Sequence, residues 1–297
     1  MIHHISTLPA TEGHATLFFF GDLQMGQDGF SKEIWKEFEN KFKKTKNAWA
    51  LGVGDYGDFL RPSMRAPLVN ALTKDDSARQ MVDSQILHAH DKIIDAMQFL
   101  DRRLIGLHEG HHNWTLLSGL NTDQRLASAL HAPYLGWSAS TRVLMNVGRT
   151  TRATYTYTMI TTHGNANGRK VPAALSWMEN NLMNGFIADQ YVMGHGCKSG
   201  NDAPFQRNTV RRSGPAGLIQ SIPRCMAIGG FSRGYTDGWN SSYVEKNGFT
   251  PQPLGWGEVY LYISHSKADA ATRGLVQRPK GDIKILTAEQ KNLVFPA

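Results

Sequence analysis

The segment ATLFFFGD, residues Ala15–Asp22, decides the fold class of this chain. Its apolar run LFFF is followed at once by a glycine and an aspartate, which is typical of a buried strand that ends in a loop. The pattern recurs at Ala48–Asp55, AWALGVGD, where a second apolar run stops at Gly-Asp. The two segments predict two buried strands whose polar ends point in the same direction.

Helical patterns separate the predicted strands. Residues Phe30–Lys46 carry apolar side chains at intervals of three and four with lysines opposite, and Ser31 could cap this helix. The same spacing over Asp75–Arg103 predicts a long helix, followed by a third strand at Leu104–Leu107. Alternation of strand and helix favours a largely parallel sheet covered by helices. Further strands are predicted at Tyr155–Thr162, Gln190–Met193, Cys225–Ile228 and Glu258–Ile263.

The composition is that of a globular protein with an excess of positive charge. Of 297 residues, 41% are hydrophobic and 19% are charged, which argues against a disordered chain. No apolar run near the N-terminus is long enough to span a bilayer or reads as a signal peptide, so we expect a cytoplasmic protein that binds no membrane. Two cysteines are too few for a disulfide scaffold. The net charge of +7 favours an anionic substrate, nucleic acid included, or else only solvates the surface.

Polar residues gather at the ends of the predicted strands. In an open α/β sheet the carboxyl ends of the strands share one rim, and ligands bind there. Carboxylates and imidazoles are metal ligands, and a pair of divalent ions suits phosphoryl transfer. The sequence therefore predicts a two-metal hydrolytic site in one domain, residues 1–297, with peripheral tails at 1–14 and roughly 266–297. The residues expected on the rim are Asp22, Asp55, His111, His163 and His195.

Each of these residues alone has an ordinary structural explanation. An aspartate after a strand often caps a turn, and a lone His163 or His195 is often a hydrogen-bonded loop residue. Cys197 alone is more often a small buried side chain than a ligand. The order of the motifs along the chain is what favours the metal site.

Five motifs, in this order, resemble those of the calcineurin-like metallophosphoesterases. That family carries DxH, GDxxD, GNH followed by an acid, a lone His, and GHxH. The sequence has Asp22-Leu-Gln24, Gly54-Asp55-Tyr-Gly-Asp58, Gly110-His111-His112-Asn113, His163 and Gly194-His195-Gly-Cys197. Two later segments, Phe231–Phe249 and Pro253–Val259, resemble the C-terminal part of phage and prophage-type members. The resemblance implies an α/β fold, a four-layer sandwich of two mixed β-sheets flanked by helices.

The resemblance also implies a role for each motif residue. Asp22, Gln24 and Cys197 would serve a first metal, and Asp55 would bridge it to a second. The second site would be completed by His111, His163 and His195. His112 would protonate the leaving-group oxygen, and Asp58 would orient His112 or support its loop.

The implied activity is hydrolysis of a phosphoester, by a hydroxide that bridges two divalent ions of manganese, zinc or iron. A nucleic-acid phosphodiester is the favoured substrate, ahead of a nucleotide or another small diester. The setting that this implies is the cytoplasm of a bacterial or phage-infected host cell. The alternative is a catalytically decayed fold that serves as a protein-binding or nucleic-acid-binding module.

Four positions depart from the family pattern. Gln24 and Cys197 stand where the family has histidines, His111 where it has asparagine, and Asn113 where it has an acid. An amide oxygen binds zinc more weakly than an imidazole does, and a thiolate favours softer metals. We therefore expect the second metal to bind tightly and the first metal loosely.

Aromatic and basic residues offer a second, weaker indication of nucleic-acid binding. Trp114, Tyr235 and Trp239 could stack on a base, although packing explains them as well and is favoured. The basic clusters Lys41–Lys46, Arg61–Arg65 and Arg211–Arg212 could guide a polyanion. The first of these ends a predicted helix, where lysines are favourable without any partner.

Overall fold

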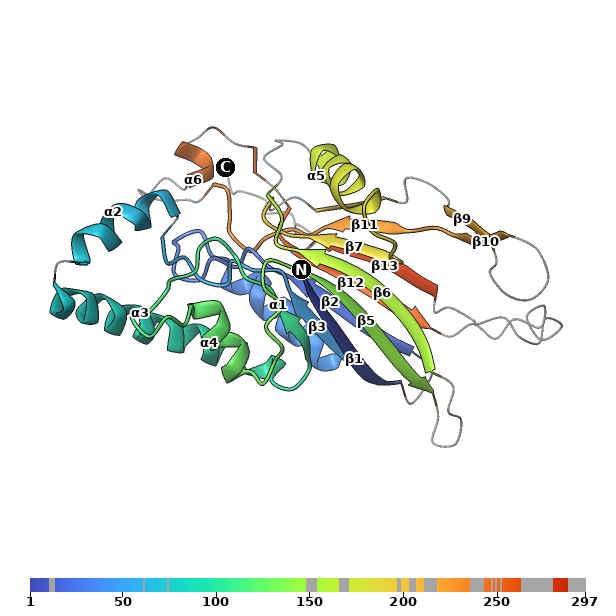
Figure 1. Ribbon diagram of the computed structural model, residues 1–297, viewed down its shortest axis with the longest axis horizontal. Helices are drawn as coiled ribbons and strands as arrows, with labels where there is room; N and C mark the ends of the chain where they lie inside the picture. Colours follow the sequence, from blue (N-terminus) through green and yellow to red (C-terminus); the bar gives the residue numbers. More distant parts are fainter. Residues whose placement is uncertain are drawn as a thin grey trace, which may run out of the picture.

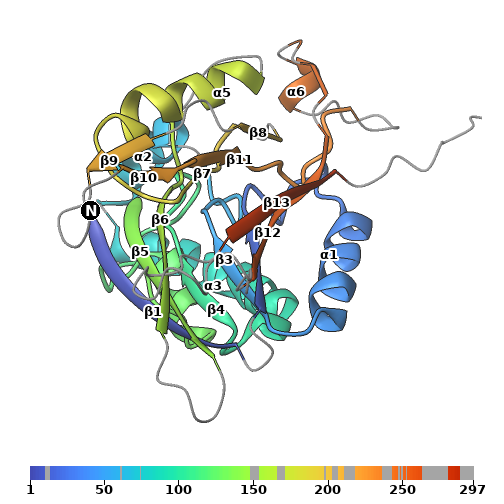
Figure 2. The ribbon, with the colours of Figure 1, turned by 90° about the vertical axis from the view of Figure 1, so that its right-hand side faces the viewer.

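Two mixed β-sheets pack face to face, and helices cover the outer face of each (Figures 1 and 2). The predicted four-layer α/β sandwich is therefore confirmed. The computed structural model describes residues 1–10, 14–60, 62–73, 75–147, 154–165, 171–196, 199–202, 207–210, 218–235, 243–246, 248, 250–251, 253–262 and 280–287.

The five-stranded sheet begins with the segment that decides the fold. Its strands β2, β3 and β4 are parallel, and β12 runs antiparallel to both β2 and β13. The order across the sheet is β13-β12-β2-β3-β4. The bounds are β2 His14–Phe20, β3 Ala48–Gly52, β4 Leu104–Leu107, β12 Gly255–Tyr262 and β13 Lys280–Thr287.

The six-stranded sheet is also mixed, in the order β1-β5-β6-β7-β11-β8. Strand β6 pairs antiparallel with β5 and parallel with β7, so β6 and β7 end at the same edge. A separate antiparallel pair is formed by β9, Arg207–Val210, and β10, Leu218–Ser221. The bounds are β1 Ile2–Ala10, β5 Ser138–Val147, β6 Thr154–Thr162, β7 Gln190–Met193, β8 Gly200–Asp202 and β11 Arg224–Ala227.

Alternation along β2 explains how the layers are joined. Because successive side chains of a strand point to opposite faces, Leu17 and Phe19 pack between the two sheets, and Phe18 and Phe20 pack against helices. All four side chains are fully buried. At about 1.5–3 kcal/mol for each buried apolar side chain, this one strand contributes strongly to both interfaces.

Helices flank both sheets. The N-terminal half of the chain provides the layer against the five-stranded sheet, and α5 with a following π-helical turn covers the six-stranded sheet. The bounds are α1 Lys32–Lys44, α2 Pro62–Leu72, α3 Asp76–Met97, the 3₁₀ turn η1 Gln98–Leu100, α4 Thr122–Ala129, α5 Val171–Met178, the π-helical turn η2 Glu179–Met183 and α6 Tyr243–Lys246.

The helix ends follow from local chemistry. The Ser31 side chain accepts a hydrogen bond from the Ile34 backbone N–H at 3.4 Å, so the predicted cap of α1 is confirmed. Asp75 caps α3 in the same way through Ser77 and Ala78. The helix predicted over Asp75–Arg103 ends at Met97 and continues only as the turn η1.

Both predicted tails contain strands. Residues 1–14 include the edge strand β1, and the region 266–297 includes β13. The sequence pattern predicts neither strand, because neither carries a continuous apolar run. Among the described residues, no helix is long and apolar enough to cross a bilayer.

Candidate metal centre

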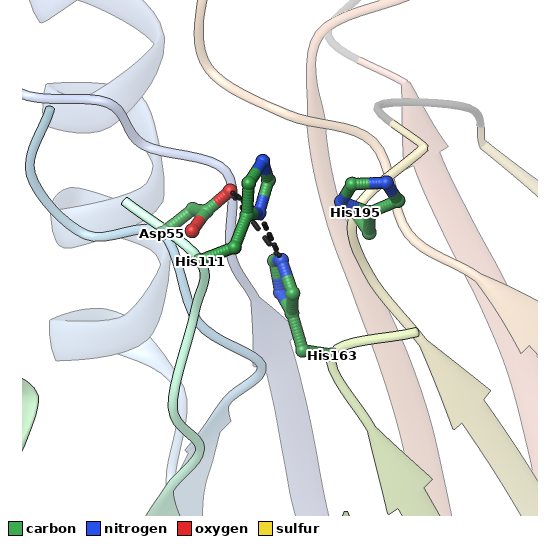
Figure 3. A group of neighbouring side chains, drawn as sticks. All are labelled: Asp55, His111, His163 and His195. Atoms are coloured by element: carbon green, nitrogen blue, oxygen red, sulfur yellow. Dashed lines mark hydrogen bonds and ion pairs between the residues drawn. The ribbon is translucent and has the colours of Figure 1, made fainter. Parts of the chain in front are cut away.

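Four strand ends from the two sheets bring one carboxylate and three imidazoles together. Asp55 and His111 follow β3 and β4 of the five-stranded sheet, and His163 and His195 follow β6 and β7 of the six-stranded sheet. One ligand atom from each residue lies within 4.8 Å of every other (Figure 3). We call Asp55, His111, His163 and His195 the metal tetrad.

The closest atoms of the metal tetrad have the spacing of ligands around one ion. Asp55 Oδ2 lies 3.0 Å from His111 Nδ1 and 3.4 Å from His163 Nε2. The two nitrogens lie 2.9 Å apart. Two atoms that are each about 2.1 Å from one cation lie about 3.0–3.4 Å apart. The three atoms therefore fit a single divalent ion.

Hydrogen bonding leaves the correct nitrogen of His163 facing the tetrad. Its Nδ1 lies 2.7 Å from the backbone oxygen of Val53, so Nδ1 carries the proton and donates it. Nε2, which faces Asp55, is then the nitrogen that a metal would bind in place of its proton. Such a backbone partner also fixes the orientation of the ring.

His195 faces the other three residues of the metal tetrad (Figure 3). Its ring centroid lies 4.7 Å from that of His111 and 5.1 Å from that of His163. Its Nδ1 is buried and makes no hydrogen bond. Burial, then the neighbouring His163 and His111, lower the pKa of His195 to about 4. A neutral ring with an unpaired nitrogen is suited to bind a metal.

The charges of Asp55 and His163 depend on each other. Burial opposes ionisation of Asp55, but His163 and His111 outweigh it and hold the pKa of this carboxyl well below its usual range. Burial also opposes protonation of His163, yet Asp55 and then Asp22 raise the pKa of His163 to about 9. The carboxylates thus attract positive charge to this point, and a divalent cation would provide it.

Asp22 supplies a further carboxylate beside the metal tetrad. Both of its side-chain oxygens are buried and neither makes a hydrogen bond. Burial raises the pKa of Asp22 to about 7, although His163 lowers it in part. An ionised carboxylate without partners is costly to bury, and a second cation would remove that cost. Phe231, much later in the chain, also contacts this loop. Its backbone N–H donates to the Asp22 carbonyl at 3.0 Å.

Of the other two residues predicted for the first metal, Gln24 and Cys197, the structure describes only Gln24. The half-buried Gln24 lies on the same loop as Asp22, and its backbone N–H donates to the carbonyl of Asp55 at 3.0 Å. Cys197 lies outside the described residues. The roles of Asp22, Gln24 and Cys197 as ligands stay predictions.

Close backbone packing requires a glycine at position 110, and four motif residues have unusual backbone conformations. A Cβ atom on Gly110 would lie 2.1 Å from the Asp55 nitrogen and 2.2 Å from its Oδ1, so no larger residue fits there. Asp22, Gln24, Asp55 and His195 all have positive φ angles, between 49° and 62°. Non-glycine residues rarely adopt this conformation, and it concentrates at functional sites.

His112 and Asp58 form a pair beside the metal tetrad. His112 Nδ1 lies 2.6 Å from Asp58 Oδ1, and the His112 backbone N–H donates to Asp55 Oδ1 at 3.0 Å. The other Asp58 oxygen accepts from Gln27 Nε2 at 2.7 Å. Burial opposes ionisation of Asp58, but these two hydrogen bonds lower its pKa. The pair predicted from the sequence is therefore brought together, with Gln27 as an unpredicted third member.

Arg65 on α2 holds the loop that carries both histidines. Its guanidinium donates to the His111 carbonyl at 3.0 Å, to Asn113 Oδ1 at 2.9 Å and to the Asn113 carbonyl. Asn113 in turn donates to the Gly110 carbonyl at 2.9 Å. The sequence identified Arg65 only as part of a basic cluster, because its partners lie more than forty residues away. Asn113 supports the loop as a neutral side chain.

The aromatic residues near the motifs differ in burial and packing. Trp114 is fully buried, and its indole N–H donates to Asp83 Oδ1 at 2.7 Å, so the packing explanation is confirmed. Tyr235 is exposed, and Trp239 lies outside the described residues. Trp137, which no sequence motif identified, packs directly on His163 with ring centroids 5.0 Å apart.

We predict that Asp123 makes the stability of the metal-free protein depend on pH. This side chain accepts from the Gly110 N–H at 2.9 Å, and burial raises its pKa from 3.8 to about 7. The folded state therefore holds the proton more tightly than the unfolded state. The resulting stability is fully present below about pH 4 and is lost as the pH rises through about 7.

Asp123→Asn stays neutral and should not lose this stability. Relative to the wild type, its free energy of unfolding should increase by about 1.3 kcal/mol between pH 5 and pH 6, and less steeply as the pH approaches 7. Urea unfolding of both proteins with a chelator present, at several pH values, measures this difference. A difference that does not change with pH would contradict the assignment.

The sequence matches no protein-family model, and no curated protein matches it. Several solved structures have a similar chain path. Vps29 from Cryptosporidium parvum has a TM-score of 0.37 at 10% identity, covering 93% of this chain and 100% of that protein. A putative 5'-nucleotidase from Staphylococcus aureus scores 0.40 at 8% identity, covering 91% and 53%. GAP50 of Plasmodium scores 0.42 at 10% identity, covering 91% and 88%. At such scores and identities these neighbours carry no functional information, and the strand order given above defines the fold.

Proposed function

We propose that this protein is a metal-dependent phosphoester hydrolase of the calcineurin-like type, acting on phosphodiesters. One observation carries the proposal: the His112–Asp58 pair is hydrogen-bonded to Asp55, a member of the metal tetrad. A cluster of metal ligands alone would fit a structural metal. A histidine held beside it by a carboxylate, with one ring nitrogen left over, is the arrangement of a general acid.

The metal tetrad would hold the tighter of two ions, and Asp22 would contribute to the second. Three imidazoles and a carboxylate suit zinc, manganese or iron. When bound, the ions would supply Lewis acidity at the phosphoryl group and activate a water molecule as the nucleophile. Asp55, with one oxygen toward two imidazoles and the other toward the His112 backbone, would keep these groups in fixed relation.

His112 would deliver the proton that the leaving group needs. Its Nδ1 faces Asp58, so a transferable proton would sit on Nε2. During hydrolysis the water releases one proton to solvent, its oxygen forms a bond to phosphorus, and the ester P–O bond breaks. The proton on Nε2 then passes to the departing alkoxide oxygen. Asp58 would stabilise the imidazolium before transfer and fix the orientation of the ring.

Nucleic acid is the favoured class of substrate. The net charge of +7 favours a polyanion, because basic residues release counterions from phosphates. A small diester, such as a nucleotide derivative, is the next candidate. Polymer binding should weaken steeply with salt, whereas cleavage of a small diester should not.

The test of the proposed function is turnover of bis(p-nitrophenyl) phosphate by the full chain. We expect hydrolysis with added manganese, loss of activity with a chelator, and recovery when manganese is restored. A protein that binds metal but shows no turnover above the metal-only background would be the catalytically decayed binding module instead.

A further inference from the structure

Trp137 lies directly opposite His163 in the six-stranded sheet. Strands β5 and β6 pair antiparallel with Ser138 opposite Thr162, and Trp137 and His163 are the next residues outward. The His163 N–H donates to the Trp137 carbonyl at 3.1 Å, and the Thr162 hydroxyl donates to the same oxygen at 3.2 Å. The backbone therefore fixes Trp137 beside a member of the metal tetrad.

The Trp137 indole contacts His163 and is also partly exposed to solvent. Its ring lies 5.0 Å from the His163 ring at an interplanar angle of 83°, and His163 is fully buried. Trp137 nevertheless remains 41% exposed. Three other tryptophans are packed into the core, with Trp35 6% exposed, Trp114 0% and Trp256 2%, and Trp49 and Trp177 are partly buried. Trp137 thus presents a large apolar ring to solvent beside a member of the metal tetrad.

We infer that Trp137 is a specificity-determining residue that stacks on a flat aromatic group, a nucleobase, carried by the phosphate ester. The inference rests on the proposed function for the position of the phosphate. A phosphoryl group held at the metal tetrad would lie on the side of His163 where Nε2 faces Asp55, and the same imidazole ring contacts the indole. The organic part of the ester is then the part that can reach Trp137.

The Trp137 side chain is preorganised for stacking in the absence of a ligand. Tryptophan has only two side-chain torsions, and here the backbone and the His163 ring already restrain it. Little conformational entropy is lost on binding as a result. Stacking of one base on an aromatic residue changes affinity by about 5- to 150-fold. A hydroxyl or an alkyl group in place of the base would gain much less.

The experiment compares adenosine 5'-monophosphate with ribose 5-phosphate, which keeps the sugar and the phosphate but lacks the base. Calorimetric titration of the manganese-loaded full chain gives the dissociation constant of each ligand. We expect the wild type to bind the nucleotide about 5- to 150-fold more tightly. Trp137→Leu should remove this preference, and Trp137→Phe should keep part of it. Leu117→Ala, at another exposed apolar residue, should leave it unchanged.

The outcomes separate this inference from the proposed function. Equal affinity of the wild type for both ligands, or no binding of either, would overturn the stacking role. The stacking role would also be overturned if Trp137→Leu weakened the binding of both ligands equally. That result would mean that Trp137 only supports His163. A base preference without any hydrolysis would refute the hydrolase and keep the stacking role. The same comparison with a short single-stranded oligonucleotide and its abasic counterpart shows whether the base comes from a polymer or a free nucleotide.

Discussion

Asp55→Ala is expected to abolish both tight metal binding and metal-dependent turnover. One Asp55 oxygen faces His111 Nδ1 and His163 Nε2, and the other accepts from the His112 backbone. Removing the carboxylate therefore takes a ligand from the metal tetrad and the anchor from the general acid. Losing only a hydrogen-bond partner of a metal ligand costs about 10- to 100-fold in metal affinity or activity. Loss of the ligand itself should cost more.

Elemental analysis after dialysis measures the first part of this prediction. We expect the wild type to retain one ion per chain and to take up a second only with excess metal. Asp55→Ala should retain none. Asp101→Ala, at an aspartate that pairs with His131 away from the metal tetrad, is the matched control and should behave as the wild type does. Two ions retained equally tightly by the wild type would contradict the expected difference between the sites, and metal retained by Asp55→Ala would contradict the role of Asp55.

Much of the fold could be predicted from the sequence because its central strands are apolar throughout. Strands β2, β3 and β4 are each buried along nearly their whole length, so their sequences are short hydrophobic runs that end at glycine or a polar residue. Their parallel pairing followed from the helices between them. Strand β2 is apolar on both faces. Phe18 and Phe20 pack against helices and Leu17 and Phe19 against the other sheet, so both faces of the five-stranded sheet must be covered.

The edge strands could not be predicted in this way. The segment IHHISTLPA of β1 is exposed at most of its described positions, and only Leu8 is fully buried there. Its strand conformation comes from pairing with β5, which lies more than a hundred residues later in the chain. Local sequence carries little information about a partner at that distance. Strand β13 is also an edge strand, and among the described residues it pairs only with β12.

The candidate site could be predicted where its residues are types that commonly bind metals. Aspartate and histidine after glycine at a strand end are conspicuous, and the order of the motifs predicted which residues would meet. Gln27, Arg65, Asp123 and Trp137 are ordinary residue types in unremarkable surroundings of the sequence. They matter because the fold brings Gln27 to Asp58, Arg65 to His111, Asp123 to Gly110 and Trp137 to His163. Only the packed structure shows these contacts.

His112→Ala is expected to slow hydrolysis by an amount that depends on the leaving group. General acid catalysis by a positioned side chain contributes about 10²- to 10⁴-fold. A p-nitrophenolate leaves readily without a proton, whereas an alkoxide does not. We therefore expect a small loss for bis(p-nitrophenyl) phosphate and a loss near the upper end of the range for a dinucleotide. The His112 backbone N–H remains in this variant, so its hydrogen bond to Asp55 and the metal content should persist.

Asp58→Asn tests the pair from its other side. The amide keeps the size of the carboxylate but removes the charge that faces His112 Nδ1 at 2.6 Å, so the imidazolium loses its partner. The loss of activity in Asp58→Asn should also be larger for the dinucleotide than for the nitrophenyl ester. It should be smaller than the loss in His112→Ala, because the His112 ring is still present. Measuring kcat and the bound metal for both substrates separates the roles. Equal losses for the two substrates, or a loss of metal that accounts for them, would mean that His112 and Asp58 shape the site without donating a proton. A leaving-group dependence at full metal content is the result that only a general acid produces.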